Sequence, residues 1–265
     1  MFSLPNLNKT LFKLGYLTMT LCSFQTFAET PSATKNHPIE VKYADTPVNI
    51  DGKPESLWDN APWLAIDQLI LGVKPVLGDF SGRYKLLWRE DKLYLLAEIV
   101  DNVLFDKTAD PTKLYWDDDC LELFIDQDAS GGEHQFNHNA FAYHVALDNQ
   151  VADFNSSQQA QTFNQHVYSR WQRDTDHPEV IYWELAINVF PDSYNDKLAA
   201  DDKLQALAVT LQLGDIIGFM LAYCDNDGSA ERESFVGSHS IIPINGDKNL
   251  GYKTADVFGK IQLIK

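Results

Sequence analysis

A tryptophan followed by a run of carboxylates is the segment of this sequence with the clearest potential for chemistry. Trp116 precedes Asp117, Asp118 and Asp119, and the strand-like segment Cys120–Asp126 comes next. An indole presents a broad apolar face on which the C–H face of a pyranose ring can stack, and a few placed polar groups then fix its orientation. The segment therefore predicts a ligand site built from an aromatic platform and carboxylates. The alternative is a core tryptophan beside an acidic loop in solvent.

Strand alternation puts Glu122 in an unusual place. One face of its segment is fully apolar and must lie against the core, with Leu121, Leu123 and Ile125. Glu122 then lies on the opposite face, between Cys120 and Phe124. A carboxylate there is costly unless it accepts hydrogen bonds. Sugar hydroxyls can donate them, and so can a buried arginine of the protein itself, and the sequence leaves both open.

Oxygen-bearing side chains alternate just after this strand, a pattern that suits calcium. Asp126, Asp128 and Ser130 are followed by Gly131, as in the first half of a calcium loop. Position 12 is Asn137 rather than glutamate, so the loop is not an EF-hand. We expect Asp126 and Asp128 to bind a structural Ca²⁺ ion. There are two further acidic stretches, residues 117–119 and residues 225–228. Each is either a solvated loop or a weaker candidate for calcium binding.

Hydrolytic chemistry has little support in the sequence. A glycosidase needs two carboxyl groups roughly 5–10 Å apart across the scissile bond, and Glu122 with the run 117–119 could be assigned that role. The chain contains 38 Asp and Glu residues, however, so accidental pairs are inevitable. The motifs Gly-x-Ser-x-Gly, HExxH and the glycine-rich phosphate loop are all absent from the sequence. We therefore expect no enzyme activity, with glycoside hydrolysis as a minor alternative.

The rest of the chain consists of short runs rich in β-branched and aromatic residues, separated by turn residues. Such runs predict an all-β fold, an antiparallel β-sandwich of immunoglobulin-like or jelly-roll-like type with short helical insertions. Asp192–Leu213 is the clearest helical stretch, and a helical turn is expected after Pro54 with Leu57 and Trp58 turned inward. The expected strands are 83–88, 92–100, 120–126, 141–147, 166–171, 180–187, 216–223 and 259–264.

The N-terminus has the features of a secretory signal peptide. Lys9 and Lys13 precede an apolar run that is too short to span a bilayer, and small residues lead to a cleavage point after Ala28. A membrane anchor is the alternative. The pattern predicts a periplasmic or secreted protein in three parts: a signal peptide over 1–28, a flexible leader over 29–38 and one domain over 39–265.

The charge balance excludes two classes of partner. The chain has 21 Lys and Arg against 38 Asp and Glu, a formal net charge of −17. The first 28 residues contain two lysines and no acid, so their removal leaves 19 basic residues against 38 acidic ones. This charge repels phosphate backbones and anionic lipid headgroups, so we expect neither nucleic acid nor membrane as a partner. It favours neutral ligands and cations.

Two cysteines remain beyond the predicted signal, Cys120 and Cys224, each within a strand-like segment. They are either a disulfide or two buried thiols, and no CxxC or Cys/His cluster indicates a zinc site.

Four segments in the same order resemble the family 9 carbohydrate-binding modules, from about residue 45 to the C-terminus. They are similar to the family's opening "IDG…E…W", its hairpin "LWD…LYV.A", its signature "W..DSVEIFID" and its final "FG.L.LIK". The matching segments are Val48–Trp58, Leu87–Ala97, Trp116–Asp126 and Phe258–Lys265.

The resemblance implies a non-catalytic site that holds the end of a glycan chain or a soluble oligosaccharide of glucan or xylan type, in support of polysaccharide catabolism. In this family two aromatic side chains sandwich the sugar, and they fall on Trp116 and Tyr252. The carboxylate that bonds sugar hydroxyls falls on Glu122. The family's Arg and Asn on the next strand fall near His144 and Ala146, so only the histidine can still donate a hydrogen bond.

A haem-binding sandwich protein of electron transfer is the alternative from another class. It would need axial ligands, for which the sequence offers Met220 with His134, His138 or His144, but there is no CxxCH motif.

Overall fold

The computed structural model describes residues 37–265, with the exception of residue 77 and residues 198–206. The predicted signal peptide, and all but two residues of the predicted leader, lie outside this part. Within it, no helix is both long enough and apolar enough to cross a membrane.

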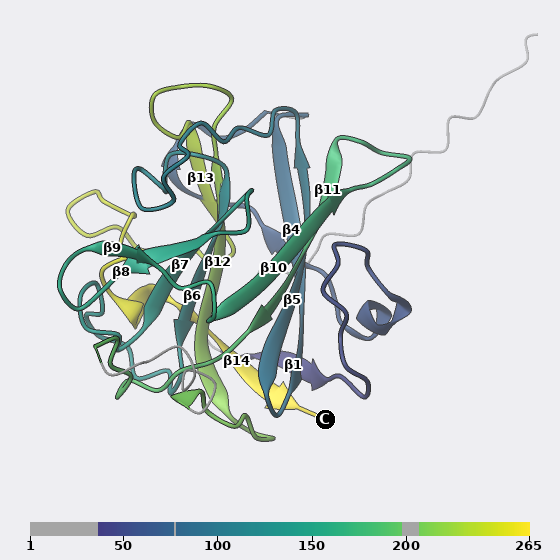
Figure 1. Cartoon of the computed structure of the whole chain (residues 1–265), viewed down its shortest axis with the longest axis vertical. Coiled ribbons are helices and arrows are strands. Elements are labelled where there is room, and N and C mark those ends of the chain that lie inside the picture. The colour runs from purple at the N-terminus through teal and green to yellow at the C-terminus, as the bar shows by residue number, and fades with distance from the viewer. Residues whose placement is uncertain (1–36, 77, 198–206) are drawn as a thin grey trace, which may run out of the picture.

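Strands make up almost all of the regular structure (Figure 1). Each strand expected from the sequence is present, so those predictions are confirmed. The strands are β1 (Ile39–Tyr43), β2 (Leu64–Ile66), β3 (Gln68–Gly72), β4 (Phe80–Arg89), β5 (Lys92–Asp101), β6 (Cys120–Asp126), β7 (Phe141–Ala146), β8 (Val151–Phe154), β9 (Ala160–Thr162), β10 (Val167–Arg173), β11 (Val180–Ile187), β12 (Ile216–Asp225), β13 (Ser234–Gly237) and β14 (Gly259–Ile264). Two 3₁₀ turns accompany them, η1 (Ser56–Asn60) and η3 (Ala255–Val257).

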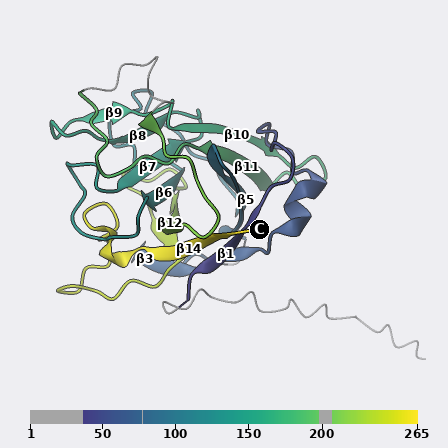
Figure 2. The same cartoon turned by 90° about the horizontal axis from the view of Figure 1, so that it is seen from below.

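The strands form one hydrogen-bonded sheet that folds over into two layers. Its order is β10-β11-β5-β4-β1-β14-β12-β6-β7-β8-β9, and β1 and β14 join the layers along one edge (Figure 2). The predicted β-sandwich is confirmed. The prediction of purely antiparallel pairing is wrong at β1, because this strand fills the gap between β14 and β4 and runs parallel to both.

The core lies between the two layers and explains the alternation along β6. Leu121 and Leu123 are fully buried in it and belong to the same cluster as Leu95 of β5, in the other layer. Full burial of a leucine side chain contributes about 1.5–3 kcal/mol. The opposite face of β6 belongs to a separate cluster with Cys120 and Phe124, as alternation predicts.

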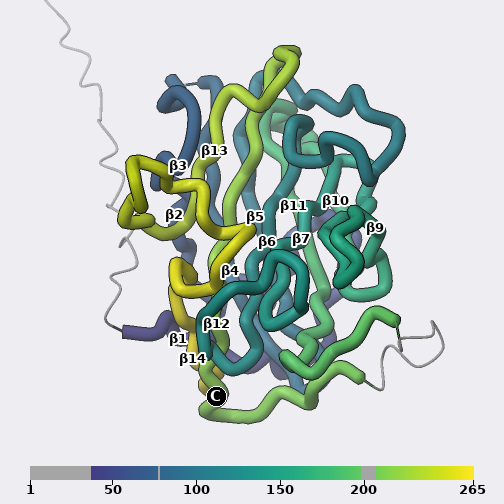
Figure 3. The backbone as a smooth tube through the Cα atoms, turned by 90° about the vertical axis from the view of Figure 1, so that its left-hand side faces the viewer, coloured from purple at the N-terminus to yellow at the C-terminus, as the bar shows by residue number. Residues whose placement is uncertain are grey.

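Two chain segments cover the outer faces of the layers. Residues 44–63, which include η1 and the buried Trp58, cover β4, β5 and β11. The segment after β13, yellow in Figure 3, crosses over β12 and β6 and contributes Ile241, Leu250 and Phe258 to the second cluster. The expected helical turn after Pro54 is therefore present, with Trp58 turned inward.

The first cover is fastened to a glutamate of β11. Glu184 is fully buried and accepts hydrogen bonds from Trp58 Nε1 at 2.9 Å, Gly52 N at 2.9 Å and Asp51 N at 3.1 Å. Gly52 has φ +78°, and a Cβ there would lie 2.6 Å from the backbone nitrogen of Gln172, so only glycine fits. This contact explains the Asp-Gly…Trp opening of the domain.

The helix expected at Asp192–Leu213 is wrong in its described first part. Residues 192–197 form turns, because Tyr194 packs against His138 and the Asp196 carboxylate bonds Ser156 instead of lying on a helix surface. Residues 198–206 lie outside the described part.

Candidate functional site

A pocket of about 320 Å³ lies on the outer face of β6, β7 and β8, where four loops converge. Trp116 and Tyr252 both line it, although they are far apart in the sequence. Both side chains are partly buried. The structure thus brings the two expected platforms to one cavity, together with Glu122 and His144.

Aromatic rings form most of the pocket wall. Besides Trp116 and Tyr252, the wall contains Tyr115 and Phe154. Tyr115 packs edge-on against Trp116, with ring centroids 4.9 Å apart, and edge-on against His144 at 4.7 Å. Tyr115 thereby braces the indole and the floor of the pocket at the same time.

Charged side chains form the pocket floor around Glu122, which is only 2% exposed. His144, directly opposite on β7, places Nε2 3.2 Å from Glu122 Oε2. Arg232, from the loop between β12 and β13, places Nη1 3.6 Å from the same oxygen. The buried arginine that the sequence left open as a partner is therefore present, and Glu122 also lines the pocket.

The contacts of Glu122 are long for charge-assisted hydrogen bonds, which are about 2.7–2.9 Å. A carboxylate can accept about four hydrogen bonds, so Glu122 retains capacity for hydroxyl donors from a ligand. Burial alone would lower the pKa of His144, but the Glu122 carboxylate outweighs this and raises it. Nδ1 of His144 lies 3.1 Å from the Ala142 carbonyl, so both ring nitrogens face acceptors.

Asp153, at the end of β8, adds a second carboxylate to the lining. Its oxygens accept hydrogen bonds from Ala142 N at 3.0 Å and Phe154 N at 2.7 Å. Burial raises the pKa of Asp153 to about 7, partly offset by these hydrogen bonds.

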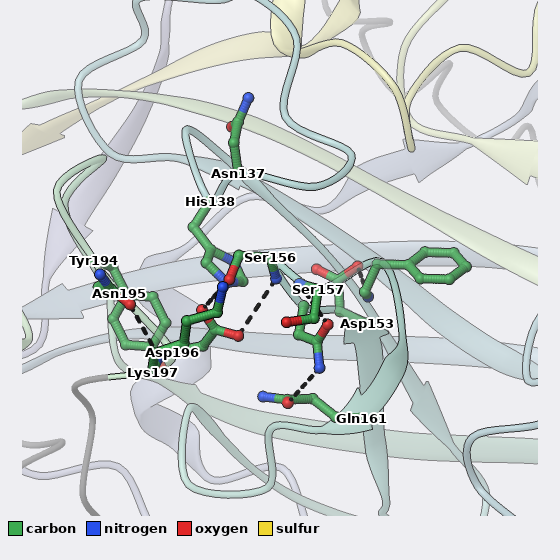
Figure 4. A network of polar contacts seen from close by, with 12 residues as sticks. Asn137, His138, Asp153, Ser156, Ser157, Gln161, Tyr194, Asn195, Asp196 and Lys197 are labelled. Atoms are coloured by element: carbon green, nitrogen blue, oxygen red, sulfur yellow. Dashed lines mark hydrogen bonds and ion pairs between the residues drawn. The ribbon is translucent and has the colours of Figure 1, made fainter.

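A polar network holds the hairpin that carries Asp153 and Phe154 (Figure 4). Ser156 Oγ donates to Asp196 Oδ1 at 2.6 Å, and His138 Nε2 lies 3.5 Å from the same oxygen. Asn155, which lies between Phe154 and Ser156 in the sequence, donates a hydrogen bond to Gln161 of β9 at 2.9 Å. The network ties the β8–β9 hairpin to segment 191–197 and so fixes one wall of the pocket.

The acidic run after Trp116 is buried, so the expectation of a solvated loop is wrong. Asp117, Asp118 and Asp119 are at most 5% exposed. Asp119 accepts hydrogen bonds from Phe105 N and Asn226 N, and Asp118 accepts one from Thr108 N. The run thus fastens the loop that presents Trp116.

A group of carboxylates lies beneath the same loops. Oxygens of Asp101, Asp225 and Asp227 all lie within 4.8 Å of one another. Asp225 Oδ1 and Asp227 Oδ1 are buried and have no hydrogen-bond partner among the described residues. Burial raises the pKa of Asp101 to about 6 and that of Asp225 to about 7.

The expected calcium ligands Asp126 and Asp128 are not part of this pocket's lining, and Asp126 lines a different pocket beside η3. Asp126 Oδ2 accepts a hydrogen bond from Gly131 N, and Asp128 Oδ1 accepts one from Ser130 N. Asp126 Oδ1 is buried and unpartnered in the described structure. Lys260 donates to the Ala129 carbonyl of this loop at 3.3 Å, so an ammonium already lies nearby.

Sequence reasoning missed six polar or aromatic residues of the lining, among them Tyr115 and Asp153 described above. Arg232, Gln135 and Asn249 lie in loops with no periodic pattern, and Phe154 ends a strand that was not predicted. The pocket lining does not include Asn149 and Gln150, two polar residues that follow Ala146 a few positions further along the chain. Their side chains bond Ser169 and Asn164 instead.

Comparison with known proteins gives a consistent result. The family model described as "Carbohydrate family 9 binding domain-like" matches residues 50–265. Endo-1,4-beta-xylanase C of Paenibacillus barcinonensis is 31% identical over 103 residues, which is 39% of this chain and 9% of that enzyme. Exoglucanase XynX of Acetivibrio thermocellus is 25% identical over 191 residues, which is 72% of this chain and 14% of that protein. The match thus covers only a small part of each relative.

Solved structures share the fold. A family 9 carbohydrate binding module from Caldicellulosiruptor kristjanssonii, in complex with cellotriose, superposes with a TM-score of 0.60 at 21% identity, covering 86% of this chain and 94% of that one. The same module in complex with glucose gives the same TM-score and covers 95% of that chain.

Proposed function

The chain belongs to the carbohydrate family 9 binding domain-like family, and from this premise we propose that it binds carbohydrate without cleaving it, in the pocket between Trp116 and Tyr252. The observation that carries the proposal is the joint presence of these two rings and Glu122 in one cavity. Pockets of about 300 Å³ and above are typical of small-molecule sites.

The physical basis of binding is stacking on the walls and hydrogen bonding on the floor. Each aromatic face contributes about 1–3 kcal/mol, by analogy with base stacking. Glu122 accepts hydroxyl protons, while Arg232 and His144 offer donors to hydroxyl oxygens. Affinity in the micromolar to millimolar range is expected, since binding must also offset the lost freedom of the ligand.

We propose glucan or xylan oligosaccharides, or the ends of such chains, as ligands. Two observations support this class. Solved structures of the fold hold cellotriose and glucose, and curated relatives are named as xylanases. A role in polysaccharide catabolism follows from the same proposal.

Binding without hydrolysis is supported by how the carboxylates are used. Asp118 and Asp119 of the acidic run accept backbone hydrogen bonds, as does Asp153. Glu122 is paired with two basic side chains, 3.2 Å from His144 Nε2 and 3.6 Å from Arg232 Nη1.

The surroundings of the candidate axial ligands do not support the alternative of haem binding. Met220 is fully buried in an apolar cluster, and His134 Nε2 lies 2.7 Å from the Gly251 carbonyl. His138 contacts Asp196 and His144 contacts Glu122.

We also propose a structural calcium ion and export from the cytoplasm. The calcium predicted at Asp126 and Asp128 stays a prediction, supported by the unpartnered Asp126 Oδ1. The group Asp101, Asp225 and Asp227 fits a hard cation more closely, because it offers three carboxylates and two unpartnered oxygens. Export rests on the sequence pattern of residues 1–28 alone.

Isothermal titration calorimetry with glucose and cello- and xylo-oligosaccharides tests the proposal. Trp116→Ala should weaken binding at least tenfold, because one stacking face is lost, and should change the free energy of unfolding little, because the ring is only partly buried. Trp63→Ala is the matched control: this partly buried tryptophan packs under Arg83 and Lys85, outside the pocket. Equal affinities of wild type and Trp116→Ala would refute the proposed clamp.

A further inference from the structure

The two cysteines lie directly opposite each other below the pocket floor. Cys120 of β6 pairs with Cys224 of β12 in antiparallel register, and both side chains are fully buried. Directly opposed residues on antiparallel strands have Cα atoms about 4.5–5.5 Å apart. This separation lies within the range of about 4.4–6.8 Å that disulfides span.

Cys224 also contacts the charged floor of the pocket. Arg232 Nη1 donates to Cys224 Sγ at 3.1 Å, and the same nitrogen lies 3.6 Å from Glu122 Oε2. Cys224 Sγ is 3.9 Å from that carboxylate oxygen. Arg232 is therefore shared between a sulfur and the carboxylate that faces the ligand.

The surroundings distinguish the two thiols. Although burial disfavours a thiolate, the Cys120 thiol and the Arg232 guanidinium lower the pKa of Cys224. Burial, together with the neighbouring Cys224, raises the pKa of Cys120. Cys224 is thus the better nucleophile of the pair.

We propose that Cys120 and Cys224 are a redox-active pair that closes to a disulfide and thereby changes how strongly Arg232 holds Glu122. The effect on ligand binding rests on the proposed function of the pocket, whereas the disulfide itself does not.

Oxidation proceeds by exchange with a small disulfide such as oxidised glutathione. The Cys224 thiolate attacks one glutathione sulfur, which breaks that S–S bond and releases one glutathione thiolate. Cys120 then attacks Cys224 Sγ and releases the second. The protein loses two electrons and two protons, and two glutathione thiols are formed. Because both sulfurs are buried, exchange requires a local opening and is expected to take minutes to hours.

Closure changes the electrostatics of the floor. A disulfide sulfur has no charge and is a weak acceptor, so Arg232 Nη1 loses its partner at 3.1 Å and turns to Glu122. A tighter ion pair leaves Glu122 with less capacity for sugar hydroxyls. We expect sugar affinity to fall roughly fivefold, as when one hydrogen bond to a charged group is weakened.

The test incubates the folded protein with oxidised glutathione, then alkylates it in denaturant and analyses its peptides by mass spectrometry. The expected result is a cross-linked peptide pair in which neither Cys120 nor Cys224 is alkylated, reversed by a reductant. Two alkylated cysteines after incubation, or glutathione retained on one cysteine, would overturn the inference whether or not the protein binds sugar.

Calorimetry of the reduced and oxidised forms tests the coupling. Cys120→Ser, with Cys120→Ala as a second variant, retains the contact of Arg232 with Cys224 but cannot close the bridge. Without oxidant both variants should bind like the reduced wild type, and oxidised glutathione should leave a glutathione adduct on Cys224 in them instead of a cross-link. Equal affinities of reduced and oxidised wild type would overturn the coupling, and sugar binding by neither form would instead contradict the proposed function.

Discussion

Glu122 and Glu184 are the same residue type in nearly the same setting, yet they differ in what covers them. Each lies near the middle of a strand, on the outer face of its layer, and each is at most 2% exposed. Glu184 accepts three hydrogen bonds of 2.9–3.1 Å from the segment that covers it. The ion-pair partners of Glu122 lie 3.2 and 3.6 Å away, and Glu122 faces a pocket.

The comparison shows that burial alone does not separate a structural carboxylate from a binding one. The difference lies in how far the chain itself satisfies the acceptor capacity of the group. At Glu184 the cover is a backbone turn and an indole N–H from the same domain. At Glu122 the pocket between Trp116 and Tyr252 takes the place of such a covering segment. We therefore expect a bound ligand to supply the remaining hydrogen-bond donors to this carboxylate.

The largest effect is expected from Glu184→Ala. This change leaves two buried N–H groups, of Gly52 and Trp58, and the part-buried one of Asp51 without an acceptor, at a cost of about 1–3 kcal/mol for each buried group. We expect the free energy of unfolding to fall by about 3 kcal/mol or more in urea titrations. The sugar affinity of the protein that remains folded should match wild type; a loss of affinity would break the distinction between the two glutamates.

Glu122→Gln should show the reverse pattern. The glutamine side chain keeps the shape of the glutamate but loses the charge that strengthens hydrogen bonds from sugar hydroxyls. The affinity for sugar should therefore fall about tenfold, the equivalent of 1.4 kcal/mol. The free energy of unfolding should fall less than in Glu184→Ala, because Arg232 keeps its contact with Cys224. Glu184→Gln is the matched control and should leave affinity unchanged in calorimetry.

A pH titration sharpens the comparison, because Asp153 beside Glu122 titrates near neutrality. Its folded pKa of about 7 exceeds the usual value of 3.8, so its contribution to stability is complete below pH 3.8 and is lost as pH rises through 7. His144 has a raised pKa and acts in the same direction. We expect Asp153 to account for about 1 kcal/mol of the loss between pH 6 and pH 8, beside a similar contribution from Asp225, whose pKa is also about 7. Asp153→Asn should flatten this slope; an unchanged slope would contradict the assignment.

A further effect, on thermal stability, concerns calcium. At a concentration tenfold above a millimolar dissociation constant, an ion that binds only the folded state adds about 1.4 kcal/mol. This corresponds to a rise of roughly 3–6 °C in melting temperature for a domain of this size. Asp227→Asn should remove the shift if the ion binds with Asp101 and Asp225, whereas Asp128→Asn should remove it if the sequence prediction is right. A shift retained in both variants would exclude both sites.

Sequence reasoning succeeded where a local pattern has a single physical outcome. Alternation along β6 fixed the core face and the outward position of Glu122, and the turn at 89–91 fixed the β4–β5 hairpin. It failed where distant loops meet. Nothing near Arg232 indicates that its guanidinium reaches Glu122, and nothing near Glu184 indicates that it fastens the segment around Trp58.

The buried acidic run is a second such failure. An Asp-rich segment is usually solvated, but here it is bonded by the backbone N–H groups of Phe105 and Thr108, from the same β5–β6 connection, and of Asn226, from the β12–β13 loop. Those partners become visible only when the loops are folded.

A crystal structure of the chain with cellotriose tests the central claim most directly. The account predicts a sugar ring stacked between Trp116 and Tyr252, with a hydroxyl group within hydrogen-bonding distance of Glu122. A sugar bound elsewhere, such as on the surface around Trp63, with the pocket occupied by solvent alone, would contradict it.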